Sequence, residues 1–357
     1  METVQTVLGP IDARELGGTM SHVHLTIDIL CWHMPYGDPA RAKEADGAFT
    51  LANIGRVRRN GLAWRRNLVQ DDVELTIREV AEYKRAGGGA LVNVDLPGMG
   101  RDVRKLQRIS RETGLHIVAS TGFYIQACHP PEIAGKRVEE LAEIMIRELS
   151  EGIDGTGIRA GNIGEIGLSG MPQEPFQPAE EKVLRAAARA QAATGASLTV
   201  HPNAQLLIYG EKLFDHFDLY LDILEKEGCD LAKVYISHLG LFPDIAIPKR
   251  LLARGVGFVS YDHFGHEEYA EGIGPGRGFS PDKEEIALVM QLLEAGLEAR
   301  VLLCAEIGWK TCYKAYGGWG YSHVYENILP WLKACGATDR QLEIMMVENP
   351  RRLHARA

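Results

Sequence analysis

Apolar and polar positions alternate along this chain with two different periods. Apolar residues recur every three or four positions over 72–85 and 102–113, a spacing that predicts amphipathic helices. A short, almost wholly apolar run follows each of them, at 90–95 and 116–120, as expected for buried parallel strands. Glycines stand where each helix should end, for example Gly114. The beginning of the chain therefore predicts helix–strand units.

The same alternation continues to the end of the chain. It predicts helices over 137–150, 179–194, 216–227, 248–254 and 281–295, and strands over 159–165, 197–201, 234–238, 256–261 and 301–305. With a strand around Met20 and a helical tail from Val324, the count is eight strands and seven internal helices. Eight such units predict an α/β fold, a (β/α)₈ TIM barrel, as one domain over 1–357. A doubly wound open sheet is the alternative.

Two stretches depart from this rhythm. Residues 31–62 show little periodicity and follow the first strand, so we expect a long loop over the barrel mouth. Residues 263–280 are rich in glycine and follow the seventh strand, on the same face. Loops at the carboxyl ends of barrel strands build the active sites of such enzymes.

Composition and charge narrow the class of partner. The net charge of −9 at pH 7 argues against nucleic acid and anionic membranes as partners. No signal peptide is visible at the N-terminus, and no run of about 18 apolar residues predicts a membrane span. The six cysteines have no paired spacing, so reduced thiols and a cytoplasmic location are expected.

Metal-ligand residue types stand at the carboxyl ends of several predicted strands. They are His22, His24, Glu165, His201, His238 and Glu306. A single strand-end histidine is more often a satisfied core residue, but in a barrel all these ends meet at one mouth. The two histidines of the His-Val-His step share one face of their strand, because strand side chains alternate with period two.

The chemistry of this set indicates a metal centre. Imidazole and carboxylate ligands suit zinc, manganese, cobalt or iron. Six ligands are too many for one tetrahedral ion and favour two divalent ions bridged by a carboxylate. A Gly-x-Ser-x-Gly motif for a serine nucleophile is absent from the sequence.

In this order, the ligand-type residues make the chain similar to the phosphotriesterase-related branch of the amidohydrolase superfamily. The supporting motifs are Gly100-Arg101-Asp102, Thr121-Gly122-Phe123-Tyr124, Gly157-Ile158-Arg159-Ala160-Gly161 and Val347-Glu348-Asn349-Pro350-Arg351-Arg352-Leu353. The resemblance covers nearly the whole chain. It is to the members with a bridging glutamate, a group in which some proteins carry a resiniferatoxin-binding label.

The resemblance implies a role for each strand-end residue. By analogy, His22, His24 and Glu306 hold one metal, His201 and His238 hold a second, and Glu165 bridges the two. Zn²⁺ is the expected metal, with Mn²⁺ or Co²⁺ as alternatives. The resemblance also implies that Tyr124 lines the substrate pocket and that the protein is a homodimer.

Two positions depart from the commonest family pattern. Many members bridge their metals with a carboxylated lysine, whereas Glu165 is a ready-made carboxylate that needs no carbon dioxide. The last family ligand is an aspartate that also accepts a proton, and here Glu306 takes its place. One added methylene moves a carboxylate by roughly 1.5 Å.

Together with these residues, the resemblance implies a hydrolase that acts on a lactone or another carboxylic ester. A hydroxide between the two metals would be the nucleophile, and Glu306 would be the catalytic proton acceptor. Two further residues are candidates for contact with a small-molecule substrate: His263 follows the seventh strand and Lys310 follows the eighth. The alternatives are a phosphotriester or phosphodiester hydrolase and a metal-containing protein that binds a small molecule with weak catalysis.

Overall fold

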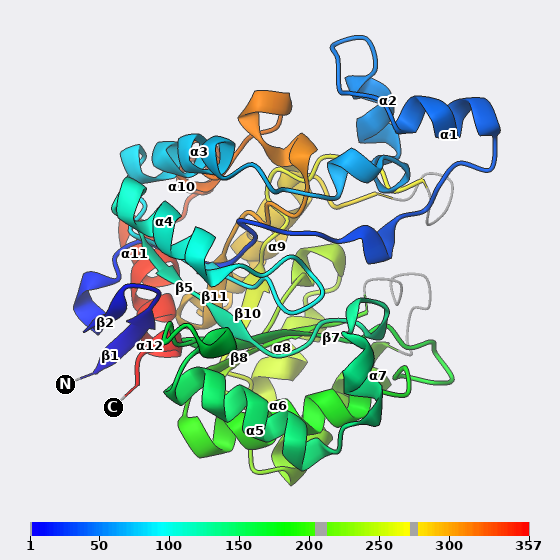
Figure 1. Ribbon diagram of the computed structural model, residues 1–357. Helices are drawn as coiled ribbons and strands as arrows, with labels where there is room; N and C mark the ends of the chain where they lie inside the picture. Colours follow the sequence, from blue (N-terminus) through cyan, green and yellow to red (C-terminus); the bar gives the residue numbers. More distant parts are fainter. Residues whose placement is uncertain (1, 204–212, 272–277, 357) are drawn as a thin grey trace.

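The computed structural model describes residues 2–203, 213–271 and 278–356 (Figure 1). The strands are β1 (Thr3–Thr6), β2 (Gly9–Asp12), β3 (Thr19–Val23), β4 (Ala90–Asn93), β5 (His116–Val118), β6 (Ser120–Thr121), β7 (Asn162–Gly167), β8 (Ser197–His201), β9 (Val234–Ile236), β10 (Phe258–Tyr261) and β11 (Val301–Leu303). The α-helices are α1 (Pro39–Ala45), α2 (Ile54–Arg59), α3 (Val73–Arg85), α4 (Val103–Thr113), α5 (Val138–Ser150), α6 (Glu180–Thr194), α7 (Leu213–Lys226), α8 (Ala246–Ala253), α9 (Asp282–Glu294), α10 (Leu329–Ala334), α11 (Asp339–Glu343) and α12 (Asn349–His354).

The central strands form the barrel that the sequence predicts. Strands β3, β4 and β5 pair in parallel, and β6 to β11 form a second parallel series in chain order. The predicted strand 116–120 is divided at Ala119 into β5 and β6, which join the two series. Between β11 and β3, the backbone N–H of Ser21 donates to Cys304 Sγ at 3.1 Å. Helices α3 to α9 lie between successive strands along the chain and surround the barrel (Figure 1).

Local signals in the sequence account for the ends of the helices. The Asp72 carboxylate caps α3 by accepting from the N–H of Leu75, and Asp102 caps α4 in the same way. Helix α4 ends at Gly114, whose φ of 67° lies in the left-handed region that favours glycine. The two aspartates mark where α3 and α4 begin, and Gly114 marks where the chain leaves α4 for the next strand.

The core fills the barrel and the layer between strands and helices. Met20, Leu91 and Ile163 from the strands are fully buried, as are Val80 and Leu184 from the surrounding helices. No helix in the described part of the chain is both long and apolar enough to cross a lipid bilayer.

The ends of the chain and the first long loop contain structure that the periodicity did not predict. β1 and β2 form an antiparallel hairpin, and Thr3 pairs with Arg356, so the two termini lie side by side (Figure 1). Strands of four residues are too short to show a clear period. The stretch 31–62, predicted as a loop, contains the short helices α1 and α2.

The expectation that all six cysteines are reduced is wrong for one pair. Cys31 and Cys128 form a disulfide between the segments that follow the first and third barrel strands. They are 97 residues apart in sequence, yet their Cα atoms lie 5.7 Å apart. Because only the folded barrel brings them together, their spacing in the sequence carried no signal. The other four cysteines are free.

Candidate metal centre and substrate cavity

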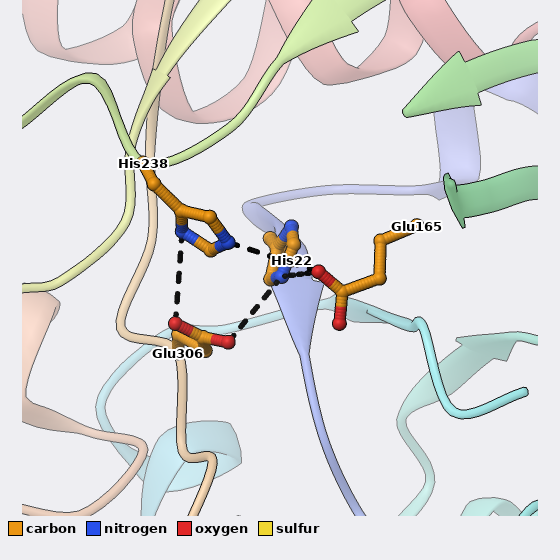
Figure 2. A group of neighbouring side chains, drawn as sticks. All are labelled: His22, Glu165, His238 and Glu306. Atoms are coloured by element: carbon orange, nitrogen blue, oxygen red, sulfur yellow. Dashed lines mark ion pairs between the residues drawn. The ribbon is translucent and has the colours of Figure 1, made fainter. Parts of the chain in front are cut away.

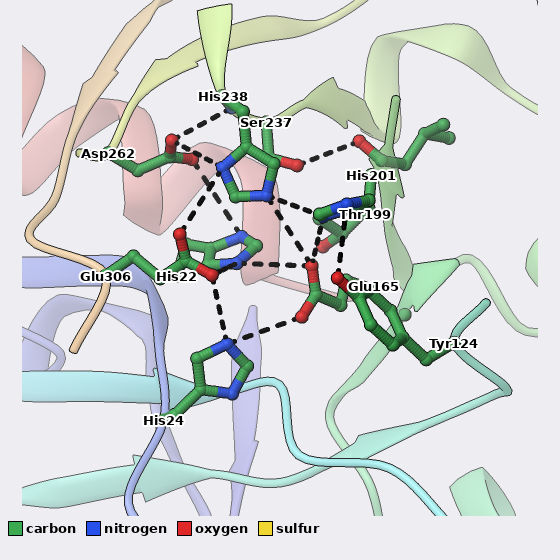
Figure 3. A network of polar contacts seen from close by, with 12 residues as sticks. His22, His24, Tyr124, Glu165, Thr199, His201, Ser237, His238, Asp262 and Glu306 are labelled. Atoms are coloured by element: carbon green, nitrogen blue, oxygen red, sulfur yellow. Dashed lines mark hydrogen bonds and ion pairs between the residues drawn. The ribbon is translucent and has the colours of Figure 1, made fainter. Parts of the chain in front are cut away.

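The six strand-end residues predicted as metal ligands meet at one mouth of the barrel (Figure 3). His22 lies within β3 and His24 follows it, Glu165 lies within β7, and His201 ends β8. His238 follows β9 by two residues, and Glu306 follows β11 by three. All six are buried except Glu306, whose side chain is 14% exposed.

The imidazole of His22 lies inside the cluster without a hydrogen bond. Its ring is fully buried, and neither ring nitrogen has a hydrogen-bond partner. Its Nε2 faces Glu165 Oε2 at 3.5 Å and Glu306 Oε1 at 3.7 Å, which is too long for hydrogen bonds (Figure 2). One ligand atom from each of four residues, His238 being the fourth, lies within 4.8 Å of the others. This is close to the spacing of the ligand atoms around one cation, so the four side chains are candidates to hold one.

Glu165 lies at the centre of the cluster with histidines on both sides. Its Oε1 is 3.4 Å from His24 Nε2, and its Oε2 is 2.9 Å from His201 Nδ1 and 3.7 Å from His238 Nε2. A carboxylate with its two oxygens turned towards different histidines has the arrangement needed to bridge two ions.

The backbone before Glu165 requires a glycine. Gly164 has a φ of +99°, and a Cβ at this position would lie 2.4 Å from the Thr199 carbonyl oxygen on the neighbouring strand. This close approach sets the direction in which the Glu165 side chain enters the barrel.

His24 is oriented by a second carboxylate that we did not predict as part of the site. Its Nδ1–H donates to Asp95 Oδ1 at 2.8 Å. The other oxygen of Asp95 accepts from the backbone and hydroxyl of Thr26. A carboxylate only accepts, so this contact places a proton on Nδ1 and turns Nε2 towards the cluster.

His238 has the same kind of support from Asp262. Asp262 Oδ1 lies 3.0 Å from His238 Nδ1 and also accepts from the His238 backbone N–H at 2.9 Å. Its Oδ2 lies 3.9 Å from His22 Nδ1 and has no hydrogen-bond partner. Asp95 ends the predicted strand 90–95 and Asp262 follows the predicted strand 256–261, so the strand-end signal that selected the ligands could have found them.

Glu306 joins the cluster to the cavity. Its Oε1 is 3.2 Å from His24 Nε2, and its Oε2 is 2.9 Å from His263 Nε2. The longer side chain thus reaches both the ligand cluster and a histidine outside it. The Glu306 backbone N–H donates to the Asp262 carbonyl at 2.6 Å, which fixes the residue against β10.

The electrostatics of the cluster favour cations. Burial opposes ionisation of Glu165, but the charges of His22 and His201 outweigh it and hold its pKa well below the ordinary value. The pKa of Glu306 is lowered in the same way, with burial outweighed by His238. Both carboxylates are therefore anionic at neutral pH, stabilised here by positive charge on the neighbouring histidines, which is a role that a divalent cation can also take.

Tyr124 lines the cavity beside the cluster. Its hydroxyl oxygen accepts from Trp32 Nε1 at 3.2 Å and lies 3.2 Å from His201 Nε2. Burial raises the pKa of Tyr124 well above its ordinary value, so the hydroxyl keeps its proton and can donate it in a hydrogen bond.

A cavity opens directly above these residues. It holds about 710 Å³ of empty space, counting the open solvent at its mouth. Its floor is formed by cluster residues and His263, and its apolar walls include Ile27, Ile29, Trp32, Leu62, Met99 and Phe279. The stretch 31–62 thus contributes Trp32 and Leu62.

The remaining candidates differ in position. His263 lines the cavity, and so does His266, whose pKa burial lowers to about 4. Lys310 is not among the lining residues, and its ammonium lies 3.9 Å from Asp71 Oδ1. Its place in the eighth loop did not reveal this contact with Asp71.

Comparison with known proteins gives a consistent result. The model of the phosphotriesterase family matches residues 2–354. N-acetyltaurine hydrolase of Homo sapiens is 35% identical over 98% of this chain and 96% of its own length. The crystal structure of a resiniferatoxin-binding protein from Rhodobacter sphaeroides superposes with a TM-score of 0.91 at 34% identity, covering 99% of this chain and 94% of that one. A phosphotriesterase homology protein from Escherichia coli, solved with phosphate in its active site, gives a TM-score of 0.77 at 27% identity, covering 96% and 100%.

Proposed function

Because the chain belongs to the phosphotriesterase family, we propose that it is a metal-dependent hydrolase of a carboxylic ester, lactone or amide. The observation that carries the proposal is His22, a buried imidazole without a hydrogen-bond partner between two anionic carboxylates. The amide is included because the human relative is an N-acetyltaurine hydrolase.

The ligand set fits two divalent ions. His22, His24 and Glu306 would hold one ion, His201 and His238 the other, with Glu165 between them. Divalent cations in such a site supply Lewis acidity for a carbonyl oxygen and lower the pKa of a bound water. The donor set of imidazoles and carboxylates suits Zn²⁺, Mn²⁺ or Co²⁺.

The protein groups around the cluster account for orientation and proton transfer. Asp95 and Asp262 hold the histidine tautomers. The Tyr124 hydroxyl faces the cavity and can donate to the substrate's carbonyl oxygen. Water adds to the carbonyl carbon, and the bond from that carbon to the leaving oxygen or nitrogen breaks. Glu306 takes the proton of the water, and the 2.9 Å contact with His263 gives that proton a path to the leaving group.

The test is hydrolysis by protein stripped of metal and reloaded. Protein loaded with Zn²⁺, Mn²⁺ or Co²⁺ should turn over members of a panel of lactones, aryl esters and N-acyl amines. His201→Ala should lower both the metal content and the turnover. A panel in which only phosphotriesters react would favour the phosphotriesterase alternative. Fully loaded protein that hydrolyses nothing would leave a small-molecule-binding protein.

A further inference from the structure

The walls of the cavity differ in chemistry from its floor. All the ligand-type groups lie at the floor, around Glu165 and Glu306. Above them, Ile27, Leu62 and Met99 present aliphatic side chains, each at most 4% exposed. None of the described residues that line the cavity is a lysine or an arginine.

Aromatic rings form one part of these walls. The rings of Phe279 and Trp309 lie 5.3 Å apart at 66°, an edge-to-face arrangement, and both line the cavity. Trp32 also lines it, with its indole N–H committed to the Tyr124 hydroxyl. Such a wall favours contact with a flat apolar group more than with a hydrated one.

We propose that this cavity selects a neutral substrate that carries an apolar aromatic group next to the scissile ester or amide bond. The inference rests on the proposed function and specifies its substrate class. The carbonyl would lie over the floor, and the aromatic group would lie against Trp309 and Phe279. An anionic group in that place would leave water without a countercharge on the described walls, which is strongly unfavourable.

This selectivity differs from the substrate in the name of the human relative. Taurine bears a sulfonate two carbons from its nitrogen. With the amide carbonyl over the floor, that sulfonate would extend beyond the ligand cluster to the place of the aromatic group, against Trp309 and Phe279. The chain would then share the family's hydrolytic floor while differing in the group that its walls accept.

Three acetamides with one common linker test the proposal on the metal-loaded wild-type protein. They are N-acetyltaurine, its neutral sulfonamide analogue, and N-(2-phenylethyl)acetamide, which differ only in the group at the end of an ethylene chain. We expect kcat/KM to rise in that order, with the phenyl compound at least about 100-fold above the sulfonate, because an unpaired buried charge costs this much or more. The sulfonamide separates the effect of charge from that of shape.

The outcomes distinguish this inference from the proposed function. Equal or faster turnover of N-acetyltaurine overturns the inference and leaves the hydrolase intact. If all three acetamides and the ester panel are inert, the proposed function fails, and calorimetric affinities of the same three compounds still decide the inference. Tighter binding of the phenyl compound supports it, and tighter or equal binding of the sulfonate refutes it.

A variant pair locates the selectivity. Trp309→Leu should lower the preference for the phenyl compound over the sulfonamide by about tenfold, since one side of the aromatic contact is lost. Trp331→Leu is the matched control, because Trp331 lies in α10, is 41% exposed and does not line the cavity. An unchanged preference in Trp309→Leu would refute the assignment of the aromatic group to this wall.

Discussion

Shortening Glu306 to aspartate should impair the enzyme. The structure shows that the glutamate uses its full length. Oε1 lies 3.2 Å from His24 Nε2, and Oε2 lies 2.9 Å from His263 Nε2. The backbone cannot easily follow a shorter side chain, because its N–H is held by the Asp262 carbonyl.

The size of the effect follows from the geometry. Glu306→Asp removes one methylene and withdraws the carboxylate by roughly 1.5 Å, which lengthens both contacts beyond hydrogen-bond distance. A misplacement of about 1 Å at a reacting group costs about 100-fold in rate. We therefore expect kcat/KM to fall about 100-fold, or about 2.7 kcal/mol of transition-state stabilisation.

The assay is steady-state hydrolysis of the best panel substrate by wild type and variant at equal metal content, measured by inductively coupled plasma mass spectrometry. Glu306→Gln is the matched control, because it keeps the length but removes the charge, and it should lower metal affinity as well as rate. If fully loaded Glu306→Asp matches or exceeds wild type, the idea that this site is built around the longer side chain is refuted.

Three further predictions follow from single contacts. His263→Ala should lower kcat about 100-fold at unchanged metal content, because Glu306 loses the histidine that passes its proton to the leaving group. A normal kcat in this variant would exclude that proton path. Gly164→Ala should displace Glu165, because the new Cβ at position 164 would collide with the Thr199 carbonyl oxygen. The amount of metal bound after gel filtration should therefore fall, and a full complement of metal in the variant would contradict this. Burial raises the pKa of Glu268 from 4.5 to about 7, so the folded protein holds this proton more tightly than the unfolded chain does. Stability should then fall by up to about 3 kcal/mol as pH rises from about 4.5 to 7. In urea denaturation at a series of pH values, the free energy of unfolding of Glu268→Gln should not fall in this way, and the variant should be more stable than wild type at pH 8. If the free energy of unfolding depends on pH equally in both proteins, Glu268 is not the group responsible.

The barrel could be predicted from the sequence because its signals are local. Helices such as α4 are marked by apolar spacing, an Asp102 cap and a glycine stop, all within a dozen residues. The hairpin β1–β2 and the helices α1 and α2 were missed for the same reason, since elements this short hold too few turns or alternations to show a period.

The candidate site was predicted in part. Its six ligand-type residues could be found because the carboxyl ends of barrel strands must converge, whatever the details of packing. Asp95 and Asp262 obey the same rule but were passed over, because an acidic residue after a strand does not show in sequence which histidine it will orient.

Local sequence signals specify the order of the barrel strands and their helices, the anionic character of the chain, and the imidazole and carboxylate types at the strand ends. The folding of the whole chain brings Cys31 to Cys128, Glu306 to His263 and Lys310 to Asp71, and none of these contacts shows in the sequence. Periodicity and residue type are properties of neighbouring positions. Distances between side chains far apart in the chain depend on the packing of the whole barrel.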